Sequence, residues 1–177
     1  MSGKSIRTIK NDYKMIILLT GKPGCGKSSL VVELIKALKD KRVAGIITPE
    51  IKDNGRKGFK IIDLVSGKED ILASVDIKTR IRVGKYGVNI KGIDNIVDLF
   101  MESFETTDYI FLDEIGKMEL YSGKFEKISE EILNSGKHVI AVVHRNLVNR
   151  YKTKGELIWV EREKIGRIKK YILNKLK

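Results

Sequence analysis

Glycines, a lysine and a hydroxyl group come together in one short segment of this sequence. Residues 21–28 read GKPGCGKS and match the pattern G-x-x-x-x-G-K-[ST] at every fixed position. The glycines leave room for backbone N–H groups to surround an anion at the start of a helix. Lys27 is then placed to reach the outer phosphates of a nucleotide, and the hydroxyl of Ser28 to bind Mg²⁺. The segment therefore predicts a phosphate-binding loop.

Two adjacent acids, Asp113 and Glu114, follow the apolar run 109–112. If this run is a strand of a parallel sheet, its carboxyl end lies at the edge where ligands gather, beside the predicted loop. Because neighbouring residues of a strand point to opposite sides, we expect the two acids to have different roles. Asp113 is predicted to hold Mg²⁺, directly or through a water, and Glu114 to orient and deprotonate a water aimed at the γ-phosphate. A general base beside the metal ligand favours hydrolysis over transfer to another acceptor.

Three further residues keep two interpretations each. His144 ends the run HVIAVVH, where it could sense the γ-phosphate or the attacking water, or be structural. Lys117 could neutralise charge in the transition state or be an ordinary solvated lysine. Cys25 lies inside the glycine loop, where a helix N-terminus can activate a thiol. The other interpretation, which we favour, is that the position calls only for a small side chain.

The elements that must position these residues alternate between strands and helices. Strands are predicted over 15–20, 43–48, 58–65, 83–90, 109–112, 138–144 and 157–160, and helices over 27–39, 93–104, 125–133 and the C-terminal segment from Ile165. This alternation favours an α/β fold with a mostly parallel sheet covered by helices on both faces. Residues 1–14 are predicted to be a polar N-terminal tail, and residues 15–177 a single domain.

Composition narrows the functional class. Of the 177 residues, 42% are hydrophobic and 33% charged, and no apolar run is long enough to span a membrane. The first residues lack the apolar core of a secretion signal, and one cysteine excludes an intrachain disulfide, so the cytoplasm is the expected location. The net charge is +12, and residues 145–177 hold eleven Lys or Arg against three Glu. A nucleic-acid partner is one interpretation; a solvated, Lys-rich surface is favoured, because aromatic residues are not interleaved with the basic ones.

Four stretches together resemble a known family. They are LTGKPGCGKSSL at 19–30, GIITPEIKDNGRKGF at 45–59, RVGKYGVNI at 82–90 and FLDEIGKMEL at 111–120, with AVVHR at 141–145 as a weaker match. In these stretches the chain is similar to the thermophile-type small nucleoside-triphosphatases, P-loop phosphohydrolases also described as nucleotide-kinase-like.

The resemblance implies a P-loop NTPase fold of the additional-strand (RecA-like) type, in which a strand separates the loop strand from the Asp113 strand. It implies Mg²⁺-dependent hydrolysis of nucleoside triphosphates to diphosphate and phosphate, with little preference among bases. It also supplies basic and glycine positions, matched by Arg56, Gly58, Lys85 and Tyr86, whose roles are open. The nucleotide-binding positions carried over are Thr20, Gly21, Lys22, Pro23, Gly24, Cys25, Gly26, Lys27, Ser28 and Ser29, and Tyr109, Ile110, Phe111, Leu112, Asp113, Glu114, Ile115 and Gly116.

The sequence thus predicts a monomeric enzyme that hydrolyses ATP, GTP, CTP and UTP, with Lys27, Glu114, Lys117 and His144 as the catalytic candidates and Ser28 and Asp113 as the metal ligands. One alternative is a nucleotide or small-molecule kinase whose acceptor pocket uses 48–60 or 80–87, with Arg56, Arg80 and Arg82 on a second phosphate. The other is a nucleic-acid-stimulated ATPase that uses the basic C-terminal third.

Overall fold

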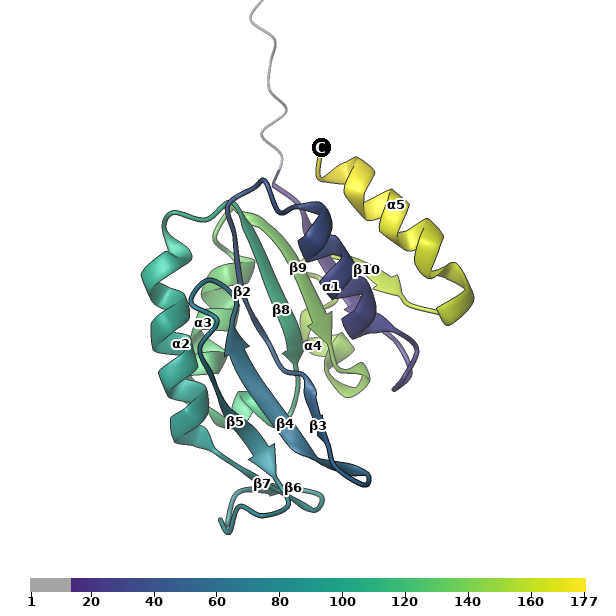
Figure 1. Ribbon diagram of the computed structural model, residues 1–177. Helices are drawn as coiled ribbons and strands as arrows, with labels where there is room; N and C mark the ends of the chain where they lie inside the picture. Colours follow the sequence, from purple (N-terminus) through teal and green to yellow (C-terminus); the bar gives the residue numbers. More distant parts are fainter. Residues whose placement is uncertain (1–13) are drawn as a thin grey trace, which may run out of the picture.

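A ten-stranded mixed sheet runs through the computed structural model, with helices on both of its faces (Figure 1). The structure describes residues 14–177, so the predicted tail, apart from its last residue, lies outside the described residues. The strands are β1 (Ile16–Thr20), β2 (Val43–Ile47), β3 (Glu50–Lys52), β4 (Arg56–Asp63), β5 (Glu69–Ser74), β6 (Arg82–Val83), β7 (Tyr86–Val88), β8 (Tyr109–Ile115), β9 (His138–Val143) and β10 (Glu156–Trp159). The helices are α1 (Lys27–Ala37), α2 (Ile90–Phe104), α3 (Gly123–Leu133), α4 (Val148–Tyr151) and α5 (Ile165–Lys175), with 3₁₀ turns η1 (Glu119–Tyr121), η2 (Arg145–Leu147) and η3 (Arg162–Lys164).

Half of the sheet is parallel and positions the site. Its strands lie in the order β10-β1-β9-β8-β2, and each pairs in parallel with its neighbours. Strand β9 therefore separates β1, which leads into the glycine loop, from β8, which carries the paired acids. This order confirms the predicted additional-strand arrangement. Because all five strands run the same way, the residues that end them meet at one edge of the sheet.

The other half of the sheet is antiparallel and was only partly predicted. Strand β4 pairs with β2, and β5, β7 and β6 continue from it, while β3 pairs with the outer part of β4. The predicted strand over 83–90 is wrong: it is a tight hairpin of β6 and β7, followed by the start of α2. Gly84 turns this hairpin with φ of +56°, a left-handed conformation that glycine adopts without strain. Strand β3 was missed because it has only three residues, and β5 because its apolar residues Ile71, Leu72 and Ala73 are consecutive and do not alternate.

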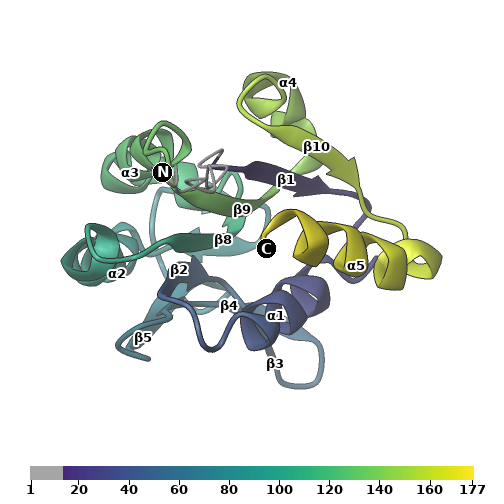
Figure 2. The same ribbon diagram turned by 90° about the horizontal axis from the view of Figure 1, so that it is seen from above.

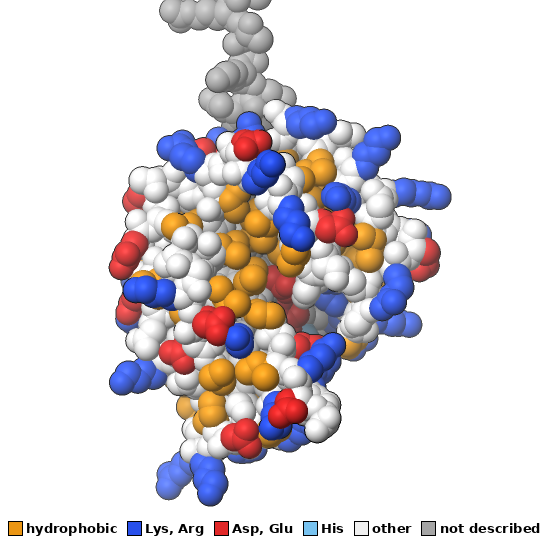
Figure 3. Space-filling model, viewed as in Figure 1, with side chains coloured by type: hydrophobic (Ala, Val, Ile, Leu, Met, Phe, Trp, Pro, Cys, Tyr) orange, Lys and Arg blue, Asp and Glu red, His pale blue; other side chains and the backbone are white. Residues whose placement is uncertain are grey.

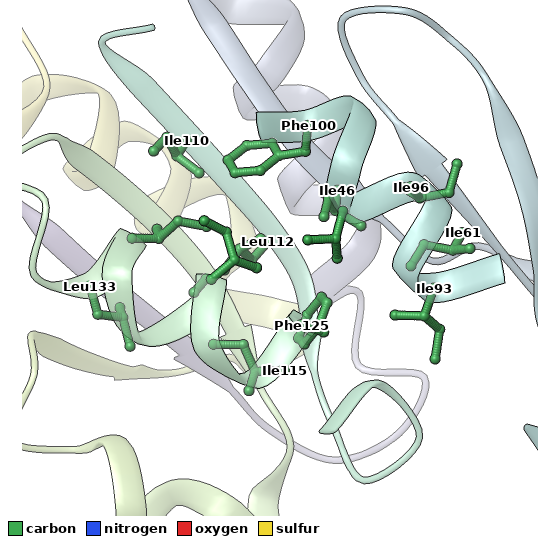
Figure 4. Packing of buried hydrophobic residues seen from close by; sticks show 14 of the residues in the cluster. Ile46, Ile61, Ile93, Ile96, Phe100, Ile110, Leu112, Ile115, Phe125 and Leu133 are labelled. Atoms are coloured by element: carbon green, nitrogen blue, oxygen red, sulfur yellow. The ribbon is translucent and has the colours of Figure 1, made fainter. Parts of the chain in front are cut away.

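Two apolar layers hold the helices to the sheet. Seen from above, the helices lie on both sides of the sheet (Figure 2). Alternation along β1 sends Ile17 and Leu19 toward α1 and α5, and Leu18 toward α2, α3 and α4. In the second layer Phe100 of α2 and Phe125 of α3 pack over the β8 residues (Figure 4). Both faces of the central strands are thus buried, which explains their nearly continuous apolar sequence.

Replacing Phe100 by alanine is expected to lower the free energy of unfolding by about 3–5 kcal/mol, because the ring is fully buried and its loss leaves a cavity. Chemical denaturation measures the change. Met101→Ala is the matched control on the same helix, since Met101 is 40% exposed and should cost little. A change below about 1 kcal/mol at Phe100 would contradict the packing described here.

Candidate functional site

The glycine loop closes tightly between β1 and α1 because two of its residues lack a side chain. Gly26 caps α1 with φ of +102°, and a Cβ there would lie 2.5 Å from Cδ1 of Ile165. A Cβ at Gly21 would lie 2.6 Å from the carbonyl oxygen of Val160. Helix α1 has no side-chain cap and no acid in its first turn. Its first N–H groups and the positive end of its dipole are therefore available to an anion.

Lys27 lies folded over this loop. Its ammonium group donates to the carbonyl oxygens of Gly21 and Lys22, both at 3.0 Å, and lies 3.7 Å from Sγ of Cys25. Cys25 is half-buried and packs against the apolar layer that contains α1 and α5. This packing supports the interpretation of Cys25 as a small loop residue.

The paired acids lie inside β8 rather than after it, so the predicted end of this strand at Leu112 is wrong. The pairing of β8 with β9 shifts between Asp113 and Ile115, which leaves Glu114 as the extra residue of a bulge, and the Asp113–Glu114 peptide bond is cis. Strict alternation is interrupted at a bulge. The expectation that the two side chains point to opposite sides assumes unbroken alternation, so at the bulge it stays a prediction. The charge of Lys27 acts on both carboxyl groups and lowers the pKa of each.

Burial dominates the acid–base properties of the pair. It raises the pKa of Asp113 to about 6, although a hydrogen bond from Ser28 and the charge of Lys27 act in the opposite direction. Burial also raises the pKa of Glu114, and again Lys27 opposes the shift. Desolvation makes both carboxylates stronger bases than exposed acids, and the charge of Lys27 counters this.

Glu119 is an acid of this cluster that the sequence analysis missed. It is only 3% exposed, and burial, followed by the charge of Glu114, raises its pKa to about 8. In the sequence it is one of several acids near 111–120, with no apolar run beside it to mark it as buried. The signal that could have found it is the short turn after Gly116, which brings the chain back toward Glu114.

His144 and Lys117 differ in their placement. His144 follows β9 at the active edge: its N–H donates to the carbonyl oxygen of Ile115 at 3.1 Å, and its Nδ1 accepts from the N–H of Asn146. Partial burial lowers the pKa of His144, and the charges of Arg145 and Lys27 lower it further. Lys117 follows Gly116, but its side chain is exposed and makes no hydrogen bond or ion pair within residues 14–177.

Four arginines of the chain are separated by their contacts. Arg162 of η3 donates to the carbonyl oxygen of Gly24 at 2.6 Å, so it touches the glycine loop. Arg150 bonds to Glu126 on α3, away from the loop. Arg56 pairs with Glu50 at 2.6 Å, and Arg82 donates to the carbonyl oxygens of Ile77 and Lys85. The guanidinium groups of Arg56 and Arg82, which a kinase acceptor pocket would need, are thus already engaged.

A glycine loop at a helix N-terminus, with one strand between the loop strand and the strand that carries the paired acids, defines the chain as a P-loop NTPase of the additional-strand class. A family model described as NTPase matches residues 16–173. The chain therefore belongs to this NTPase family, and the enzyme class predicted from the sequence is confirmed.

Known relatives agree with this assignment. The chain is 42% identical over 166 residues to the nucleoside-triphosphatase THEP1 of Methanocaldococcus jannaschii, covering 92% of this chain and 97% of that protein. It is 46% identical over 140 residues to THEP1 of Sulfolobus acidocaldarius, covering 77% of this chain and 80% of that protein. The crystal structure of THEP1 from Aquifex aeolicus superposes with a TM-score of 0.81 at 31% identity, covering 92% and 99% of the two chains. The solution structure of a human cancer-related nucleoside triphosphatase shares the fold, with a TM-score of 0.73 at 24% identity and 92% and 97% coverage.

Proposed function

We propose that this protein hydrolyses nucleoside triphosphates to diphosphates and phosphate, with a divalent metal as cofactor and water as the acceptor. The observation that carries the proposal is the convergence of Lys27, Asp113 and Glu114: the ammonium group on the glycine loop acts on the carboxyl groups of the buried Asp113 and the half-buried Glu114 on β8. Figure 3 shows a hollow in the face of the molecule seen in Figure 1, with acidic side chains in its floor.

Each residue has a separate task in this proposal. The loop N–H groups and Lys27 bind the β- and γ-phosphates and hold them in line for attack. Glu114 takes a proton from a water molecule while the oxygen of that water bonds to the γ-phosphorus and the bond to the β-phosphate oxygen breaks. His144 lies at the same edge and is proposed to orient this water. Lys117, being exposed, would have to turn inward to reach a phosphate.

The donor set fits Mg²⁺. Asp113 is buried with the hydroxyl of Ser28 against it, and both supply the hard oxygen ligands that Mg²⁺ prefers. Within residues 14–177 no group of three His, Cys, Asp or Glu side chains is arranged to hold a metal by itself. The remaining ligands would come from phosphate and water, as is usual for Mg²⁺. When bound, the ion would neutralise charge on the phosphate oxygens.

Broad base specificity is part of the proposal, because the identified contacts address phosphate and metal rather than a base. The relatives carry names that specify no single nucleotide.

We also propose that the enzyme works as a cytoplasmic monomer. Residues 14–177 contain no helix long and apolar enough to cross a membrane.

A nucleic-acid-stimulated ATPase is less well supported than simple hydrolysis. Several basic residues of the C-terminal third are paired with acids: Lys164 with Glu161, Lys169 with Glu33 and Lys175 with Glu156. In Figure 3 the Lys and Arg side chains are spread over the visible face, with Asp and Glu between them. This distribution favours a solvated surface over a continuous basic track.

The test is phosphate release from ATP, GTP, CTP and UTP, each measured with Mg²⁺ and with excess EDTA, in the absence of any acceptor. We expect release from all four, with kcat/KM values within about tenfold of one another, a spread of about 1.4 kcal/mol, and a loss of activity in EDTA. Activity that appears only after a nucleoside monophosphate is added would indicate a kinase instead. A rise on adding RNA that disappears at high salt would indicate the nucleic-acid-stimulated enzyme.

A further inference from the structure

Two carboxyl groups approach the same glycine beside the proposed reaction centre. A Cβ on Gly116 would lie 2.7 Å from Oε2 of Glu119 and 3.0 Å from Oε1 of Glu114. Glycine alone leaves room for both groups at this point. The carboxyl groups of Glu114 and Glu119 are therefore neighbours, on the side of Glu114 where the chain leaves β8.

Glu119 is held in place by the surrounding structure. It begins η1, where its carbonyl oxygen accepts from the N–H of Ser122 at 3.0 Å. The hydroxyl of Ser122 in turn caps α3 by accepting from Phe125 and donates to Asp94 of α2. The backbone groups of Glu119 and Gly116 act on its carboxyl group and lower the pKa, against the effect of burial. A side chain that is only 3% exposed has little space to swing away from Glu114.

We propose that Glu119 is a positioning residue, whose fixed carboxyl group forms the wall that confines the Glu114 carboxylate and keeps it aimed at the reacting water. This inference rests on the proposed role of Glu114 as the general base. A glutamate side chain has several rotatable bonds, so an unconfined Glu114 carboxylate would spend much of its time pointing away from the attacking water. Lys27 attracts the Glu114 carboxylate from the loop side, and Glu119 limits it from the side of Gly116.

The chemical state of Glu119 suits this role and suggests the diagnostic variants. Its pKa is raised to about 8, so the carboxyl group is mostly protonated at pH 7 and adds little negative charge beside Glu114. Glutamine has the same shape and is neutral, so it should replace Glu119 with little loss. Alanine removes the wall. Asp63→Asn is the matched control, because Asp63 is also a buried acid but lies on β4, where it bonds to Ser66.

The experiment is steady-state phosphate release at pH 7 for Glu119→Ala, Glu119→Gln, Asp63→Asn, Glu114→Gln and the double variant Glu114→Gln/Glu119→Ala, with melting temperatures for each. We expect Glu119→Ala to lower kcat by about 10–100-fold with KM within about threefold, since misplacing a catalytic group costs this much. Glu119→Gln should stay within about threefold of the parent. In the Glu114→Gln background, removal of Glu119 should have almost no further effect on kcat, because there is no longer a base to position.

Two outcomes would overturn the inference. One is a normal kcat in Glu119→Ala; the other is an equal fold-loss with and without Glu114, which would indicate a structural role only. If one of these two outcomes is found and Glu114→Gln still has a low kcat, the proposed function stands while the positioning role fails. If Glu114→Gln turns over normally, both fail. Should Glu119→Ala not fold, Gly116→Ala is the second probe: its methyl group would displace both carboxyl groups, and a similar fall in kcat at unchanged KM is expected, whereas a normal kcat would contradict the inference.

Discussion

The Glu114→Gln variant is expected to lose about 10²–10⁴-fold in kcat while still binding the Mg²⁺–nucleotide complex. Glutamine keeps the size of the side chain and its capacity to accept a hydrogen bond, but it cannot take the proton of the attacking water. The wild-type carboxylate is well suited to this task, because burial raises the pKa of Glu114 toward neutral pH, against the opposing charge of Lys27. The free energy of binding should change little, since Glu114 is not proposed to contact the nucleotide in its ground state.

Two measurements made on the same preparation decide this prediction: single-turnover phosphate release, and the dissociation constant of a fluorescent nucleotide in the presence of Mg²⁺. Glu131→Gln is the control, because Glu131 is exposed to solvent on α3 and is not part of the acid cluster. A kcat within about threefold of the parent would remove Glu114 from the role of base. Loss of nucleotide binding together with turnover would instead place it among the metal or phosphate ligands.

A feature of the fold or of the site could be predicted from the sequence only where it gives a recognisable pattern of neighbouring residues. The glycine loop left one, since it is a fixed pattern between an apolar strand and a helix. The parallel strands left another, because burial on both faces gives apolar runs such as Ile16–Thr20. Only the resemblance, and not the local pattern, indicated that β9 would lie between β1 and β8. The order of strands depends on contacts between segments far apart in the sequence, which periodicity does not report.

The features that were missed arise from tertiary structure. The bulge at Glu114 depends on the pairing of β8 with β9, so alternation along β8 alone could not reveal it. Glu119 is buried only because η1 folds back against Gly116, and its sequence neighbours do not distinguish it from a surface glutamate. Strand β5 buries only Leu72 and Ala73, and it pairs with β4 and β7 rather than with the parallel strands. In each case the deciding contact joins residues that no sequence window brings together.

Lys27→Ala should show the other large effect, with a kinetic signature distinct from that of Glu114→Gln. The ammonium group is held by the carbonyl oxygens of Gly21 and Lys22, so it already points into the loop before any ligand arrives. Such a preorganised charge stabilises the negative charge on the β- and γ-phosphate oxygens both in the bound substrate and in the transition state. Its removal should therefore weaken nucleotide binding and also lower kcat, by about 10²–10³-fold.

Two further variants show whether the effect of Lys27→Ala comes from the position of the ammonium group or from the loss of a positive charge alone. Lys36→Ala removes an exposed lysine from the same helix α1. It should leave the dissociation constant of the nucleotide and kcat close to those of the parent. Lys27→Arg keeps the charge but replaces a compact ammonium group by a wider planar one with a different hydrogen-bonding geometry, so it should not restore activity. Titration calorimetry and phosphate release at saturating nucleotide measure the two constants. Unchanged binding in Lys27→Ala would mean that the loop N–H groups hold the triphosphate without help from Lys27. Recovery in Lys27→Arg would mean that charge alone, rather than the fixed position of the ammonium group, is what the loop requires.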